Sequence, residues 1–195
     1  MADRTDWRTL HHETVFTAGP IHEVAIERVQ LPDGRTIPDY YVVRLPDYAL
    51  IYAEIDDGTV PMLRQYRHGV RRVCLAFPGG AVEQGESALV AARRELLEET
   101  GYEAAQWQSL GSFVTNANQG CNVVHLFRAR SCRRISEPCS ADLEETSIEY
   151  VQPATLLDRA GLREVGLASH VALLLLATHP AVNAVGVEER LDAPW

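Results

Sequence analysis

The sequence predicts a protein of mixed α and β structure, of the α/β (α+β) class. Segments rich in β-branched and aromatic residues, bounded by turn residues, lie on both sides of a strongly helical stretch at residues 86–100. Two more helices are expected near the C-terminus, at residues 153–160 and 167–179, the second ending before Pro180. A chain of 195 residues, 46% of them hydrophobic, can bury a full core in one domain with some extra elements.

The N-terminal region is expected to form antiparallel strands. Residues 1–12 are polar and predict no element, whereas residues 15–43 are rich in β-formers and turn at Pro32-Asp33-Gly34. We expect an N-terminal extension at 1–57, a main domain at 58–180 and a tail at 181–195.

The next two strands are predicted at residues 49–55 and 60–66. Asp56-Asp57-Gly58 between them is typical of a hairpin turn, so the two strands are expected to pair. Pro61 lacks an N–H group, which predicts that the second strand begins at an edge or a bulge.

The central helix follows a Pro78-Gly79-Gly80 turn and stops before Gly101, a residue typical of a left-handed helix C-cap. Glu95, Glu98 and Glu99 have helical spacing and share one face. Ala88, Ala91 and Ala92 share that face one or two turns earlier and leave room for a bulky group. The acidic face is either solvated or a site for a hard cation such as Mg²⁺.

The spacing of this segment resembles the signature of the Nudix hydrolases. The matching positions are Gly80, Glu86, Arg94, Glu95, Leu96, Glu98, Glu99 and Gly101, and only Tyr102 departs, where the signature has an aliphatic residue. The resemblance implies a Nudix fold, a mixed β-sheet between helices with an N-terminal antiparallel β extension.

The same resemblance implies roles for the residues of the signature. The Gly79 carbonyl and the carboxylates of Glu95, Glu98 and Glu99 would hold two or three Mg²⁺ (or Mn²⁺) ions that bridge a diphosphate and ionise a water molecule. Arg94 would orient the glutamates, and Glu86 would brace the turn at the helix start.

Upstream, Gln65-Tyr66-Arg67 before a Phe-Pro-x-Gly turn resembles the ADP-ribose pyrophosphatase branch of the family. Arg67 matches an arginine that contacts substrate in that branch, and Gln65 and Arg64 are candidates beside it. These side chains could equally belong to a solvated strand end.

Residues 131–143 are polar and predict a mobile loop. In pyrophosphatases of this branch, a loop glutamate just before the following strand acts as the base or as an extra ligand. Glu145 is the candidate here, with Glu144 as the alternate, and solvent exposure is the simpler interpretation of either residue alone.

The resemblance implies hydrolysis of a nucleoside diphosphate linked to another moiety, such as ADP-ribose or a nucleotide sugar. Residues 116–120 lack a proline that members preferring ADP-ribose often carry, so other substrates remain open, including GDP-mannose and dinucleoside polyphosphates. A non-catalytic module that binds a nucleotide sugar is the rival interpretation, although such modules usually lose an acidic residue that this chain retains.

The composition and net charge of the chain limit the kinds of binding partner that we expect. The net charge of −9 argues against a sequence-independent nucleic-acid surface, and the longest apolar run, 171–177, is too short for a membrane span. All 18 basic residues are arginine. Four scattered cysteines suggest reduced thiols in a cytoplasmic protein. Related pyrophosphatases use their N-terminal strands to dimerise, so the resemblance implies a homodimer.

Overall fold

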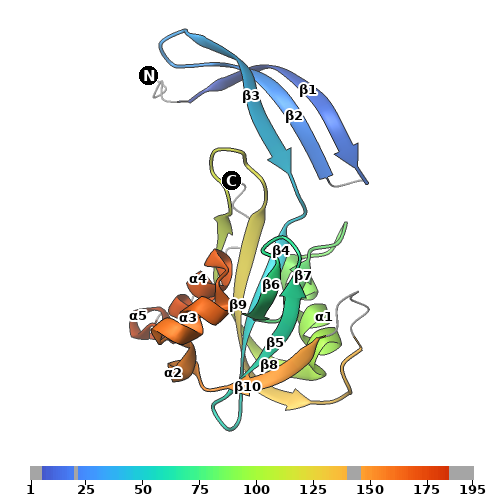
Figure 1. The fold of residues 1–195 in the computed structure, drawn as a ribbon, viewed down its shortest axis with the longest axis vertical. Helices are drawn as coiled ribbons and strands as arrows, with labels where there is room; N and C mark the ends of the chain where they lie inside the picture. The colour runs from blue at the N-terminus through green and yellow to red at the C-terminus, as the bar shows by residue number, and fades with distance from the viewer. Residues whose placement is uncertain (1–5, 20–21, 140–145, 185–195) are drawn as a thin grey trace. The chain divides into compact units, whose positions relative to one another are not determined.

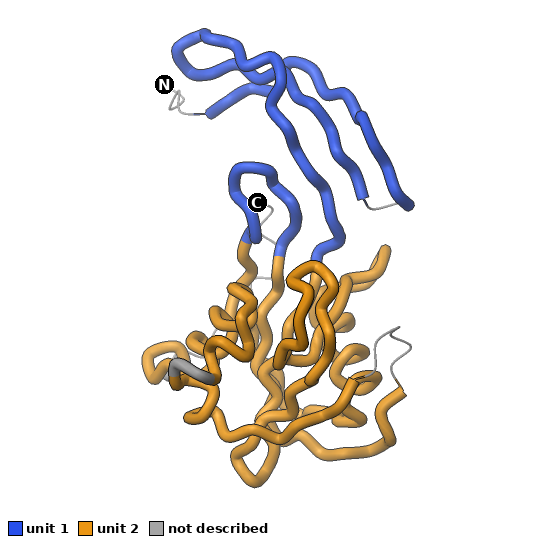
Figure 2. Tube along the Cα trace, in the orientation of Figure 1, with its two compact units in different colours: residues 1–47, 114–123 blue, residues 48–113, 124–195 orange. Residues whose placement is uncertain are grey.

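The computed structural model describes residues 6–19, 22–139 and 146–184. Its contacts divide the chain into two compact units, which are considered separately (Figure 2). Unit 1 contains residues 1–47 and 114–123, and unit 2 contains residues 48–113 and 124–195. Residues 48–57, which the sequence grouped with the N-terminal extension, thus belong to the larger unit.

Unit 1 is built on a three-stranded antiparallel sheet in the order β1 (Arg8–Ala18), β2 (His22–Gln30), β3 (Thr36–Arg44). The turn between β2 and β3 falls at the predicted position, where Gly34 has a φ of 89°. Strand β1 begins inside the stretch that the sequence left unassigned. All eleven of its residues are exposed, including the large apolar side chain of Phe16.

Unit 2 contains two sheets. One has the order β10-β5-β6 and the other the order β7-β4-β9-β8. The strands are β4 (Tyr48–Ile55), β5 (Val60–Arg67), β6 (Arg72–Ala76), β7 (Gly79–Ala81), β8 (Tyr102–Val114), β9 (Val123–Arg134) and β10 (Ser147–Val151). The predicted loop from residue 131 therefore begins as the end of β9.

The predicted pairing of β4 with β5 is wrong. Strand β4 has β7 antiparallel on one edge and β9 parallel on the other, so neither edge is open to β5. The turn itself forms, since the Gly58 N–H donates to the Ile55 carbonyl at 2.9 Å, but the chain then passes into the other sheet. Pro61 pairs with Tyr150 of β10, and pairing with β6 begins only at Leu63. The start of β5 therefore lies at an edge, as predicted.

Strand β4 contributes to both hydrophobic cores of unit 2, because successive side chains point to opposite faces of a strand. One face, with Ala49 and Ile51, packs against α1 (Ala88–Thr100) in a core that includes Ala91, Ala92 and Leu96. The room expected beside these alanines is thus filled by the strand. The other face packs against the C-terminal helices (Figure 1).

The C-terminal helices are α2 (Pro153–Leu156), α3 (Arg159–Val165), α4 (Ala168–Thr178) and α5 (Pro180–Ala184). The predicted helix at residues 153–160 is divided because Asp158 caps α3, accepting the Gly161 N–H at 2.6 Å. Helix α4 ends before Pro180, as expected. The helices of the described chain are too short, or too polar, to span a bilayer. The predicted mixed β-sheet between helices is confirmed.

Candidate active site

Helix α1 presents the acidic face, and its two ends are fixed by local chemistry. The Ser87 hydroxyl caps the start by accepting the Val90 N–H at 3.3 Å, so Glu86 precedes the helix instead of opening it. Gly101 ends the helix with a φ of 76° and donates its N–H to the Leu97 carbonyl at 2.8 Å, the predicted left-handed cap.

Arg94 joins this helix to the turn before it. Its guanidinium donates from Nε and Nη2 to the two carboxylate oxygens of Glu86, at 3.1 and 3.0 Å, and from Nη2 to the Ala81 carbonyl at 3.0 Å. Nη1 donates to Oε1 of Glu95 at 2.7 Å and to Oε2 of Glu98 at 3.3 Å. The fork shape of a guanidinium suits the bidentate contact with Glu86. Arg94 lowers the pKa of Glu86, so that carboxylate stays charged.

Two glycines let the glutamates approach the turn. The Gly79 N–H donates to Oε2 of Glu99, a buried residue, at 2.7 Å. Gly79 has a φ of 151°, and a Cβ on it would collide with the Ala49 carbonyl oxygen. A Cβ on Gly80 would lie 2.6 Å from the carboxyl carbon of Glu95. Glu95 and Glu99 therefore both face the turn at close range.

The donor chemistry of this face fits a hard divalent cation. Mg²⁺ and Mn²⁺ prefer oxygen ligands, and the face offers three carboxylates within one helical turn. Within residues 6–19, 22–139 and 146–184, however, no three acidic, His or Cys side chains are gathered as a finished metal site. A cation held by these oxygens would share Glu95 and Glu98 with the Arg94 guanidinium.

The three residues of β5 that were predicted to bind substrate do not share one face of the strand. Arg64 binds Glu149 of β10 and Glu164 of α3, the second at 2.9 Å. Gln65 and Arg67 point to the opposite face. Gln65 is 1% exposed, yet among the described residues neither its amide nitrogen nor its oxygen has a hydrogen-bond partner, and the same holds for Nε of Arg67.

A buried histidine, His170 of α4, contacts the residue just before the turn. His170 of α4 accepts the Phe77 N–H at Nδ1, 3.0 Å away, and its ring is nearly parallel to that of Phe77. Burial, and then the nearby Arg67 charge, lowers the pKa of His170 to about 3, so the ring is neutral. Nothing in the local sequence signals this contact, which depends on the packing of α4 against the strands.

A profile of the NUDIX domain matches residues 45–168, which is more than half of the chain. The chain belongs to the Nudix family. The ADP-ribose pyrophosphatase of Bacillus subtilis (strain 168) is 31% identical over 80% of this chain and 83% of its own length. The ADP-ribose pyrophosphatase of Mycobacterium tuberculosis (strain ATCC 25618 / H37Rv) is 28% identical over 97% of this chain and 91% of its own.

Solved structures support the Nudix fold. The crystal structure of an ADP compounds hydrolase superposes with a TM-score of 0.74, covering 88% of this chain and 91% of that chain at 21% sequence identity. The predicted family, fold and enzyme class are confirmed. Glu144 and Glu145, the predicted loop glutamates, lie outside the described residues.

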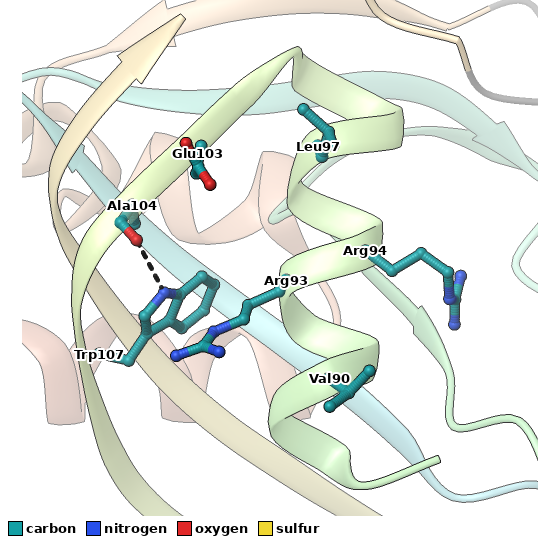
Figure 3. Close-up of a pocket in the computed structure, with 7 residues that line it drawn as sticks. All are labelled: Val90, Arg93, Arg94, Leu97, Glu103, Ala104 and Trp107. Atoms are coloured by element: carbon teal, nitrogen blue, oxygen red, sulfur yellow. Dashed lines mark hydrogen bonds between the residues drawn. The ribbon is translucent and has the colours of Figure 1, made fainter. Parts of the chain in front are cut away.

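A pocket of about 480 Å³ lies on the outer side of the Nudix helix, between α1 and β8 (Figure 3). Its lining residues are Val90, Arg93, Arg94, Leu97, Glu103, Ala104 and Trp107. The Arg93 guanidinium lies 5.9 Å from the Trp107 ring centre, whereas that of Arg94 points away from Trp107 (Figure 3). The three glutamates of the acidic face do not line this pocket, which shares Arg94 with the candidate active site.

Proposed function

We propose that this Nudix hydrolase cleaves the pyrophosphate bond of a nucleoside diphosphate linked to another moiety. ADP-ribose, giving AMP and ribose 5-phosphate, is the foremost substrate, followed by related nucleotide sugars. The observation that carries the proposal is the Arg94 clamp, in which one guanidinium binds both Glu95 and Glu98 while Glu95 lies against Gly80 of the turn. The two pyrophosphatases to which the chain is similar support ADP-ribose as the substrate.

Hydrolases of this family need a divalent metal ion, and we assign its binding to the acidic face. Glu95, Glu98, Glu99 and the carbonyl of Gly79 would hold Mg²⁺ or Mn²⁺. When bound, the metal would neutralise diphosphate charge and lower the pKa of a water molecule. Arg94 keeps two of the carboxylates in place, and Gly79 holds the third through its N–H.

Gln65 and Arg67 are the proposed substrate-binding residues. A buried carboxamide without partners is costly, and a polar ligand would satisfy both its donor and its acceptor. The Arg67 guanidinium matches phosphate oxygens. Arg64 is already paired with two carboxylates, so we place it third among the substrate candidates.

Glu145 is the proposed base that accepts a proton from the attacking water, with Glu144 as the alternate. A base must come within ~2.6–3.2 Å of the proton it takes, and a loop can bring it there when substrate binds. Glu145→Gln should slow turnover while leaving KM within a few-fold.

We also propose a cytoplasmic homodimer that does not bind nucleic acid. The exposed apolar side chains of unit 1, among them Phe16 at 60% exposure, support a partner surface there. Light scattering at micromolar concentration should show a dimer, and a monomer alone would contradict the assembly.

The function is tested by measuring hydrolysis of the phosphoanhydride bond in ADP-ribose, ADP-glucose, GDP-mannose and a dinucleoside polyphosphate. Each compound is assayed with Mg²⁺ and with Mn²⁺. In H₂¹⁸O, the label should enter one of the two product phosphates. Cleavage without label in either phosphate would exclude pyrophosphate hydrolysis. Glu98→Gln is the matched inactive control. If no compound is cleaved but one binds, the chain is a non-catalytic nucleotide-binding module.

A further inference from the structure

The short link between the two sheets of unit 2 depends on a residue from a distant helix. Strand β6 ends at Ala76 and strand β7 begins at Gly79, so Phe77 and Pro78 lie between two ladders. The last pair of the first ladder is Leu63 with Ala76. Phe77 is 1% exposed, and its N–H donates to Nδ1 of His170.

Each of the three residues leading to the acidic face is held by a hydrogen bond from outside the link, and Gly79 also pairs with Leu50 of β4. After the Phe77 N–H, the Pro78 carbonyl accepts the Ile51 N–H at 2.9 Å. The Gly79 N–H then donates to Glu99. Because β7 has only three residues, its pairing with β4 begins after Phe77 and leaves that residue to be held by His170.

We propose that His170 is a positioning residue of the active site, which fixes Phe77 through Nδ1 and thereby sets how Gly79 meets Glu99. The inference rests on the proposed function, in which Glu99 is a metal-binding carboxylate. Nδ1 accepts a hydrogen bond, so the ring hydrogen is on Nε2. Without Nδ1, the buried Phe77 N–H lacks its acceptor, and the backbone must move to find another.

The test compares substitutions that keep or remove the acceptor. His170→Asn places an amide oxygen close to the position of Nδ1, and His170→Phe keeps the ring but has no acceptor. His170→Gln carries its oxygen one bond further out and replaces His170→Phe if that variant does not fold. Leu174→Ala is the control, since Leu174 is buried on the same helix and this variant keeps the Nδ1 acceptor of His170.

Three measurements are made on the full chain, at a temperature where every variant is folded. Amide hydrogen exchange of Gly79 by NMR should accelerate about tenfold in His170→Phe and stay near wild type in His170→Asn and Leu174→Ala. The Mn²⁺ dissociation constant, by electron paramagnetic resonance, should rise by about the same factor in His170→Phe alone. With ADP-ribose, kcat should fall in His170→Phe while KM stays within about twofold.

Equal Gly79 exchange and equal Mn²⁺ affinity in His170→Phe and His170→Asn would overturn the proposal. So would an equal loss in Leu174→Ala, because the effect would then reflect general destabilisation. Hydrogen exchange needs neither metal nor substrate. A wild-type protein that hydrolyses nothing would therefore count against the proposed function, while the exchange result would still decide the role of His170.

Discussion

Replacing Gly80 by alanine should damage the active site without unfolding the protein. Gly80 does not have a positive φ, so its backbone is open to alanine, and the substitution lowers the entropy of the unfolded chain. The new Cβ would meet the carboxyl end of the Glu95 side chain, which can turn aside. Gly79 differs, because there the obstacle is the backbone of Ala49 and Leu50 and φ is positive.

The size of the effect follows from the contact. The Cβ would lie 2.6 Å from the Glu95 carboxyl carbon. Ordinary carbon contacts are about 3.5–4.0 Å, so the carboxylate must move by about 1 Å. A misplacement of that size can cost about 10²-fold in rate, which is about 2.7 kcal/mol. The free energy of unfolding should change by no more than about 1 kcal/mol.

The assay is kcat/KM for ADP-ribose at saturating Mg²⁺, together with urea denaturation. Gly69→Ala is the matched control, because Gly69 also lacks a positive φ and a Cβ there would have nothing within 4 Å. The control should keep full activity. Full activity in a folded Gly80→Ala would show that the Glu95 position against the turn does not matter, and the assignment of Glu95 would be wrong.

Three further predictions concern other parts of the chain. Glu98→Gln should lower kcat about 10²-fold or more, at about 3 kcal/mol, with little change in Tm, and near-full activity with added Mg²⁺ would contradict the metal assignment. Gln65→Leu should raise the free energy of unfolding by about 1 kcal/mol in urea denaturation, since it removes an unpaired buried amide. The same variant should have a higher KM, and a lower stability would contradict the idea that the Gln65 amide is unpaired. The carboxylates of Glu27 and Glu23 accept hydrogen bonds from the His12 ring and raise the pKa of His12 above 6.5. The stability that this pair contributes is therefore present in full below pH 6.5 and is lost as pH rises through the folded-state pKa. An NMR titration should show a lower His12 pKa in Glu27→Gln, and an unchanged value would disprove the contact.

Local chemistry is what the sequence predicted well. The Gly101 cap needs only a residue that tolerates a positive φ, and the shared face of Glu95, Glu98 and Glu99 follows from helical spacing. The start of the helix was placed two residues early. Glu86 is a good helix former, but the Ser87 hydroxyl caps α1, and Glu86 instead pairs with Arg94.

Contacts between segments that are distant in the chain could not be predicted from the sequence. An Asp-Asp-Gly turn at residues 56–58 is compatible with strands that pair and with strands that diverge. Strands β4 and β5 diverge here, since β7 occupies the edge of β4 that β5 would need. The small side chains of Ala91 and Ala92 were predicted to leave room for a bulky group on the acidic face. They instead pack against β4, because small side chains also let a helix approach a strand closely. Arg64 and Gln65 are adjacent, yet strand alternation sends them to opposite faces.

The parallel pairing of β4 with β9 bears on the order in which the protein folds. Tyr48 lies opposite Val124, and the whole of α1 comes between them in the chain. The entropy of closing so long a loop opposes this pairing, so it forms after local structure. A ribosome-bound chain that has just completed α1 therefore has every residue of the acidic face but lacks β8 and β9, the two strands that complete the sheet beneath it.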